Sequence, residues 1–211
     1  FKNWWAAGLS FFNTRQISII NDSIINNKWI GIYVTGGDTV NIDSSEVMYN
    51  GSITNNDKGG GIYLNIDHAR LTTSLLNFNK SKNGGGLYIN SFSPFIYNNT
   101  FYSNQCSTNG GAIFTGGTTT TNPTMVYNTI VNNSSAINTG GGIYILKTNI
   151  NRTKVSRNII SENLGHGIYG DPDSLIQNNL TYNKFINGSA GYALRKTNNV
   201  NLDATYNWWG T

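Results

Sequence analysis

The sequence has little charge, almost no sulfur and no long apolar run. Only 11% of its 211 residues are charged, against about a quarter in an ordinary globular domain. No stretch is apolar for long enough to span a membrane, and no basic run favours binding to nucleic acid. Low charge combined with many Asn, Ser, Thr and Gly residues predicts an extracellular or cell-surface protein.

Other scarcities limit the chemistry. Cys106 is the only cysteine, so no internal disulfide can form, and its polar surroundings predict an idle thiol and not a nucleophile. The ten acidic residues are scattered. Asp171 and Asp173 flank Pro172, where a tight turn is a better interpretation than a weak calcium site. We therefore expect no cofactor and no metal ion.

Two short patterns recur in the same order along the chain. In the first, an apolar residue is followed three places later by Asn, at intervals of 20 to 30 residues. The Asn residues of this pattern are Asn27, Asn50, Asn79, Asn104, Asn133, Asn163, Asn183 and, in a weaker copy, Asn207. The second pattern is a small-residue run that leads into Ile or Leu and an aromatic, as in Gly61-Ile62-Tyr63.

A period of this length without helical spacing is typical of a solenoid. The segments Ile32-Tyr33-Val34 and Val40-Asn41-Ile42 alternate with a period of two, which indicates short strands. About 25 residues per repeat suffice for three strands and three corners. The sequence thus predicts an all-β fold, a parallel β-helix of about eight coils, in one domain covering residues 1–211.

Gly and Asn suit the corners of such coils. Runs such as Gly84-Gly85-Gly86 supply backbone freedom where a Cβ would collide with neighbouring coils. The eight Asn residues can tolerate a left-handed backbone, and each amide can bond to the Asn of the next coil as a ladder. This structural role is favoured over a catalytic one.

The chain resembles the right-handed parallel β-helix superfamily, and in particular the polymorphic outer-membrane-protein class of adhesin passengers. Phe101-Tyr102-Ser103-Asn104 and Gly110-Gly111-Ala112-Ile113 match both halves of that class's paired signature. Most other coils have Ile, Val or Leu for the Phe, and Gly for the Ala. The resemblance implies a right-handed β-helix, but this architecture carries lyases, glycosidases, adhesins and structural proteins.

The two ends of the chain echo each other, with Asn3-Trp4-Trp5 and Asn207-Trp208-Trp209. A solenoid has open ends, which must be capped or joined to something. We expect the chain to have lost its start or to be one segment of a longer surface protein. End-to-end contacts with neighbouring copies in a fibre, or with flanking domains, are predicted for Trp4, Trp5, Trp208 and Trp209; the alternative is that they fold over their own ends.

One aromatic position recurs in six coils, at Tyr33, Tyr63, Tyr88, Phe114, Tyr144 and Tyr169. If the flanking aliphatic residues point inward, this column points outward. An exposed stripe of rings could bind cell-surface glycans or a partner protein. The alternative is that the rings stabilise one another or are covered by a corner loop.

A carbohydrate-active enzyme remains the main alternative class. Asn65-Ile66-Asp67-His68 is similar to the Trp-Ile-Asp-His segment of pectate lyases, but it lacks the Trp, and the family's Arg-containing motif is not found. Enzymes on this fold need carboxylates that converge on one groove. Corner polar residues explain the segment equally well, so no catalytic residue is assigned.

Possible glycosylation sites follow from the Asn-x-Ser/Thr pattern. They are Asn21, Asn50, Asn79, Asn98, Asn132, Asn133, Asn151, Asn179 and Asn187. Taken together, the residues favour a non-catalytic structural or adhesive protein of the cell surface. The alternative is a polysaccharide lyase, glycosidase or glycan-binding module.

Overall fold

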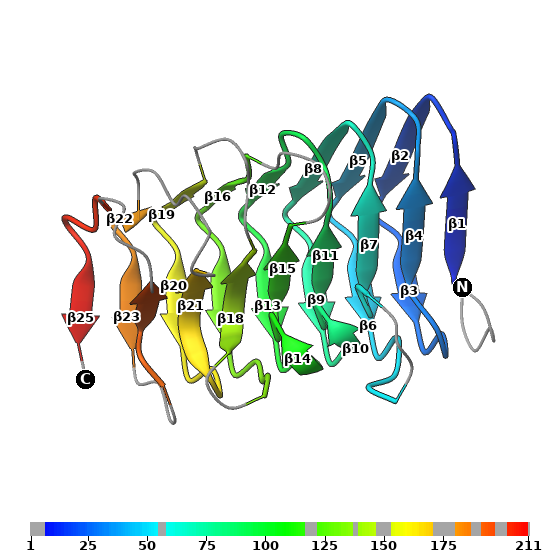
Figure 1. Cartoon of the computed structure of the whole chain (residues 1–211). Helices are drawn as coiled ribbons and strands as arrows, with labels where there is room; N and C mark the ends of the chain where they lie inside the picture. The colour runs from blue at the N-terminus through cyan, green and yellow to red at the C-terminus, as the bar shows by residue number, and fades with distance from the viewer. Residues whose placement is uncertain are drawn as a thin grey trace.

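The computed structural model describes residues 7–54, 58–116, 122–136, 139–146, 153–170, 180–186, 191–196 and 202–210. The described chain winds through three parallel sheets, one strand per sheet in each coil, and the coils follow one another from the N-terminal to the C-terminal end (Figure 1). The expected parallel β-helix is confirmed. Within the described residues, seven coils place a strand in all three sheets, slightly fewer than the eight expected.

The strands of each sheet pair in coil order. The first sheet contains β1 (Leu9–Phe12), β4 (Ile32–Thr35), β7 (Ile62–Asn65), β11 (Leu87–Ile89), β15 (Ile113–Thr115), β18 (Gly140–Ile145), β21 (His166–Gly170) and β24 (Leu194–Lys196). The second contains β2 (Gln16–Ile20), β5 (Thr39–Asp43), β8 (His68–Thr72), β12 (Phe95–Tyr97), β16 (Thr124–Val126), β19 (Lys154–Ser156) and β22 (Leu180–Thr181).

The third sheet contains β3 (Ser23–Ile25), β6 (Glu46–Met48), β9 (Leu75–Asn77), β13 (Thr100–Tyr102), β17 (Thr129–Val131), β20 (Ile159–Ser161), β23 (Lys184–Ile186) and β25 (Trp208–Gly210). A short pair, β10 (Lys80–Asn83) and β14 (Gln105–Asn109), lies outside these sheets. We call the bends from the first to the second sheet, from the second to the third, and from the third to the first corners 1, 2 and 3.

The period-two alternation of each strand separates core from surface. In β4, Ile32 and Val34 are buried while Tyr33 and Thr35 are less so, because successive side chains of a strand point to opposite faces. Parallel register then stacks like on like, as Ile32 pairs with Ile62 and Tyr33 with Tyr63. The result is one aliphatic core along the inside of the coils.

Buried amides form a ladder at corner 3. Its members are Asn27, Asn50, Asn79, Asn104, Asn133 and Asn163. Asn79 Nδ2 donates to Asn104 Oδ1 (3.0 Å), and Asn104 Nδ2 donates to Asn133 Oδ1 (3.0 Å) and to Leu76 O (2.8 Å). Each buried amide therefore satisfies its neighbour and a main-chain carbonyl, as buried polar groups require.

Asn183 and Asn207 belong to a second ladder, so the predicted single ladder is wrong at these two positions. The second ladder lies at corner 2 and consists of Ser45, Ser74, Asn99, Asn128, Asn158, Asn183 and Asn207. Both corners have the same local plan, in which an apolar inward residue precedes the ladder residue by three positions. The apolar-x-x-Asn pattern therefore occurs at two corners of a coil and does not tell them apart.

The left-handed residue is the one before the ladder residue, and not the ladder Asn itself as predicted. At corner 3 these residues are Asn26, Tyr49, Phe78, Ser103, Asn132 and Glu162, with φ between 52° and 59°. The left-handed residue turns the chain, and the next side chain can then point inward to the ladder. The glycines before the first sheet have the predicted steric role: a Cβ on Gly61 would lie 2.5 Å from Gly86 O in the next coil.

Candidate functional site

A groove of about 970 Å³ runs along corner 1 of the N-terminal coils. Four consecutive coils line it, from Asn13 in the first to Phe92 in the fourth. Asp38, Asp67 and Phe92 each follow a strand of the first sheet and precede one of the second. His68 N donates to Asp38 O (3.0 Å), and Phe92 N donates to Asp67 O (3.2 Å). The parallel register therefore places these three residues beside one another.

A row of polar side chains forms the floor of the groove. Asn65 Nδ2 donates to Thr35 Oγ1 (3.2 Å), and Asn90 Nδ2 donates to Asn65 Oδ1 (2.9 Å). Gly36 has a left-handed backbone (φ +70°) and leaves space for the Asn13 side chain at one end of this row. A Cβ at Gly36 would lie only 2.1 Å from Asn13 Oδ1. Amide and hydroxyl groups fixed in this way can offer hydrogen bonds at defined positions.

Phe92 is the apolar part of the groove. Its side chain is 49% exposed, and among the described aromatic contacts its ring has no neighbour. In a hollow beside the groove, Asn41 Oδ1 is buried without a hydrogen-bond partner among the described groups. A free ring face beside carboxylate, amide and imidazole groups suits a ligand with both apolar faces and hydroxyl groups, which is the character of a sugar.

The carboxylates at the groove are exposed rather than enclosed. Asp38 Oδ2 is 3.6 Å from Arg15 Nε, but both side chains are largely in solvent, so this ion pair contributes little to stability. No group of three or more His, Cys, Asp or Glu in the described residues could hold a metal ion.

The structure places the candidate Asn65-Ile66-Asp67-His68 segment on this groove. Sequence reasoning missed Asp38 and Phe92. A signal for Asp38 was present, since Asp38 and Asp67 both come directly before a strand of the second sheet, where Val40 of one coil aligns with Ala69 of the next. Phe92 lies at the same corner of the next coil, three residues before Phe95, as Asp67 lies three before Arg70, the partner of Phe95.

The aromatic column lies on the outside of the first sheet. Consecutive rings from Tyr33 to Tyr169 are 4.8 to 5.3 Å apart and nearly parallel, with interplanar angles of 4° to 13°. Trp29 and Phe12 contact the N-terminal ring of the column, Tyr33. Burial, and after it the neighbouring Tyr33 and Tyr88 hydroxyls, raises the pKa of Tyr63 to about 12.

The prediction of an exposed stripe is wrong for the centre of this column. Tyr88, Phe114 and Tyr144 are at most 6% exposed, and Leu146 packs against their cluster. Because the rings face one another along the solenoid axis, the faces of the central rings are covered and only edges point outward. The column therefore stabilises the coils and offers a sugar no central ring face.

The geometry agrees with the comparison of the sequence with protein families. The family model described as a right handed beta helix region matches residues 7–180. The chain belongs to this family. No curated protein and no solved structure matches the chain. Family membership therefore establishes the right-handed β-helix and leaves the activity open, since this architecture carries both enzymes and non-enzymes.

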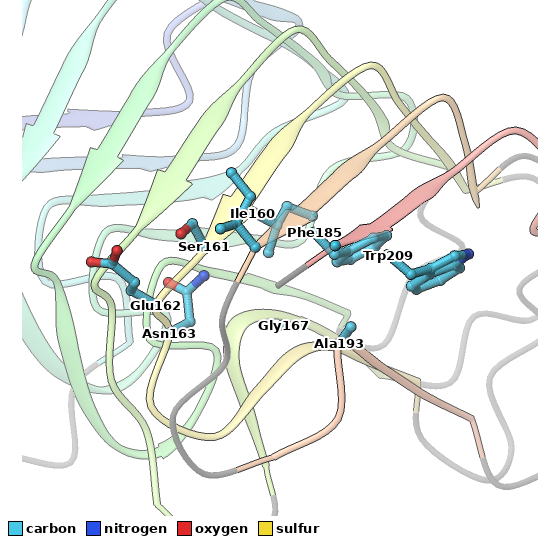
Figure 2. A pocket seen from close by; sticks show the side chains of 10 residues that line it. Ile160, Ser161, Glu162, Asn163, Gly167, Phe185, Ala193 and Trp209 are labelled. Atoms are coloured by element: carbon cyan, nitrogen blue, oxygen red, sulfur yellow. The ribbon is translucent and has the colours of Figure 1, made fainter.

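In this β-helix, the two C-terminal tryptophans point in different directions. Trp209 pairs with the buried Phe185 and stacks on it at 4.6 Å, in line with the apolar core. Trp208 faces outward, with Lys184 Nζ 5.0 Å from its ring centroid. Trp209 and Phe185 lie along one wall of a cavity of about 260 Å³ (Figure 2). Trp4 and Trp5 lie outside the described residues.

The β-helix also sorts the candidate glycosylation sites. Asn50, Asn79 and Asn133 are fully buried ladder members, so their amides are engaged and the prediction is wrong for them in the folded chain. Asn21, Asn98 and Asn132 are exposed at corners. Asn151, Asn179 and Asn187 lie outside the described residues, as do Asp171 and Asp173.

The Cys106 thiol is buried, and desolvation raises its pKa to about 12. Such a thiol stays protonated near neutral pH and is a poor nucleophile.

In the part of the chain that the structure describes, no helix has the length and apolar character needed to cross a membrane.

Proposed function

We propose that this β-helix is a non-catalytic structural or adhesive element of a cell surface, exposed to the extracellular medium. The continuity of the two buried ladders carries the proposal. At every step of each ladder, the main-chain N–H of one ladder residue donates to the side-chain oxygen of the ladder residue in the next coil, from Asn27 to Asn163 and from Ser45 to Asn207. Satisfied buried polar networks rigidify a structure, so the described coils form a stiff rod.

Low charge and exposed polar corners support an extracellular location, because ordinary intracellular domains have about a quarter charged residues. The ends of the rod are the places for neighbouring copies or flanking domains, with Trp208 and Trp209 at one of them. The exposed corner sites Asn21, Asn98 and Asn132 are available for glycosylation. No nucleic acid and no membrane span belong to this proposal.

Location and assembly are tested separately. Antibodies against the folded protein should label intact, unpermeabilised cells of the source organism, and labelling only after permeabilisation would contradict a surface role.

Electron microscopy at low and high protein concentration tests assembly. Filaments with an axial repeat near the length of one chain indicate end-to-end contacts, which Trp209→Ala should weaken, whereas isolated rods at every concentration exclude self-assembly.

The groove at corner 1 supports a second candidate, a glycan-binding module. The observation in its favour is the free ring of Phe92 beside Asp38, Asp67 and the Asn65–Asn90 pair. On a glycan array, Phe92→Ala should abolish the binding shown by the wild-type protein. Phe12→Ala is the matched control, because Phe12 is also exposed but its ring contacts Tyr33 of the aromatic column.

Catalysis at this groove is tested separately. The protein is incubated with the glycans that it binds, and new reducing ends or unsaturated products are measured. We expect none. Product formation that Asp67→Asn removes would make the chain a glycosidase or a lyase and would overturn the non-catalytic proposal.

A further inference from the structure

Corner 2 carries an exposed row of rings and one guanidinium in the C-terminal coils. Its left-handed position is occupied by Tyr127, Arg157, Tyr182 and Tyr206 in four successive coils, with φ between 56° and 59°. The three tyrosines are between 47% and 74% exposed. In the preceding coils the same position holds Asn21, Ser44, Thr73 and Asn98.

Arg157 lies between two rings. The Cζ atom of its guanidinium is 5.6 Å from the centroid of Tyr127 and 5.4 Å from that of Tyr182. Tyr206 stacks on the other side of Tyr182 at 5.0 Å. Contact with an aromatic face on either side orients a planar guanidinium, so its N–H edge is held toward solvent at little further loss of freedom.

The surroundings of Arg157 are basic and aromatic. On the adjacent third sheet, Ile159 and Trp208 are exposed and Lys184 lies over the Trp208 ring. Among the described residues, Arg15 forms an ion pair with Asp38, and Arg157 has no carboxylate partner. The carboxylate of Asp203, near Tyr206 in the sequence, accepts hydrogen bonds from Thr205 N and Thr205 Oγ1.

We infer that this surface, Tyr127, Arg157, Tyr182 and Tyr206 with Lys184 and Trp208, binds an acidic segment of a partner protein, whose carboxylate the Arg157 guanidinium holds. A planar fork matches a carboxylate with two parallel hydrogen bonds, and the tyrosine hydroxyls beside it are further donors. Tyr, Trp and Arg are also the residues most enriched at the centres of protein interfaces.

A peptide fits this surface better than a sugar chain does. A pyranose needs a free aromatic face, but Arg157 and Tyr206 cover the two faces of Tyr182 and Arg157 covers one face of Tyr127. Between Tyr127 and Tyr182, what remains outward is the ring edges, the hydroxyls and the guanidinium edge. The surface is separate from the Phe92 groove, so the inference does not depend on glycan binding.

The test measures binding of poly-L-glutamate to the whole chain by isothermal titration calorimetry at low salt. Arg157→Asn should weaken binding roughly tenfold or more, because a charge-assisted bidentate contact is lost. Asn already occupies this corner position in Asn21 and Asn98, so the backbone is retained. Arg157→Lys, which keeps the charge but not the planar fork, should give an intermediate affinity.

Arg70→Gln is the matched control. Arg70 Cζ also lies over a ring, 4.9 Å from the Phe95 centroid, but among the described residues it lies over one ring and not between two. Its replacement should leave the affinity unchanged. Equal affinity of wild type and Arg157→Asn, or an equal loss in Arg70→Gln, would show general attraction to a basic protein and overturn the inference. Polygalacturonate bound as tightly as poly-L-glutamate would overturn the choice of a peptide.

Discussion

The N-terminal and C-terminal coils bend in the same way at corner 2 but display different side chains there. From Asn21 to Asn98 the left-handed position is small and polar, and from Tyr127 to Tyr206 it is aromatic or cationic, yet φ stays between 50° and 59° throughout. Asn tolerates this conformation, whereas Tyr and Arg disfavour it. The bend is therefore fixed by the coil, and the rings of the C-terminal half need an explanation beyond folding.

The largest expected effect concerns what the two halves share. Asn104→Ala should lower the free energy of unfolding by about 3 kcal/mol, because Leu76 O, Asn79 N and Asn133 Oδ1 would lose buried partners. Asn158→Ala, in the other ladder, should cost about as much. Urea denaturation measures both, with the exposed Asn98→Gly as a control of little effect. A much smaller loss in one variant would mean that the two ladders do not stabilise the coils equally.

A smaller loss of stability is expected when a glycine that precedes a strand of the first sheet is replaced by alanine. Gly61→Ala should destabilise by about 2 kcal/mol because the new Cβ meets main chain, Gly86 O, which cannot move aside easily. Gly142→Ala should do the same in the C-terminal half, where the Cβ would lie 2.3 Å from Gly167 O. Ala112→Gly is the reverse change at the matching position. An unchanged denaturation midpoint for both alanine variants would refute the steric role.

The comparison itself is tested by moving a ring into the N-terminal half. Ser44→Tyr should lower the free energy of unfolding by about 1 kcal/mol, since a bulky residue would adopt a left-handed backbone without ring neighbours. Ser44→Asn should be close to neutral. Thermal and urea unfolding measure the difference. If Ser44→Tyr is as stable as wild type, the rings of the C-terminal half need no functional explanation.

The smallest effect is a dependence on alkaline pH. The pKa of Tyr63 is raised from an ordinary 10.0 to about 12 in the folded chain. The unfolded chain therefore loses this proton first, so stability is complete below about pH 10 and declines as the pH rises toward 12. Tyr63→Phe should make the decline shallower. Unfolding titrations at pH 9 and 11.5 compare the two proteins, and identical declines would mean that Tyr63 does not contribute.

Sequence alone predicted the coil and its three sheets because local patterns encode them. The alternation in Ile32-Tyr33-Val34 and the steric need for Gly61 are properties of one or two adjacent coils. The sequence pattern does not separate the two ladders, because at both corners an apolar residue lies three positions before the ladder residue. The step of 20 residues from Asn163 to Asn183, shorter than the other steps, was the trace of the change from one ladder to the other.

The candidate site was harder to predict because its residues come from four consecutive coils. Asp67 was singled out from its own segment, but Asp38 and Phe92 join it only through the register of β5, β8 and β12. Orientation was also out of reach. The repeat places Tyr88 and Phe114 in one column, but only coordinates show that the rings face each other, and this decides whether a ligand can use them.

The ladders also set how the protein can change in length. Successive corner 3 amides are 23 residues apart in one coil and 30 in another, yet the donor–acceptor distances are 2.8 and 3.0 Å. The loops absorb the surplus, and longer loops are thermodynamically inexpensive. Each coil thus adds about the same rise along the axis, although the number of residues in a coil varies. Evolution or an engineer can lengthen the rod by whole increments, or insert sequence at a corner, without disturbing the register elsewhere.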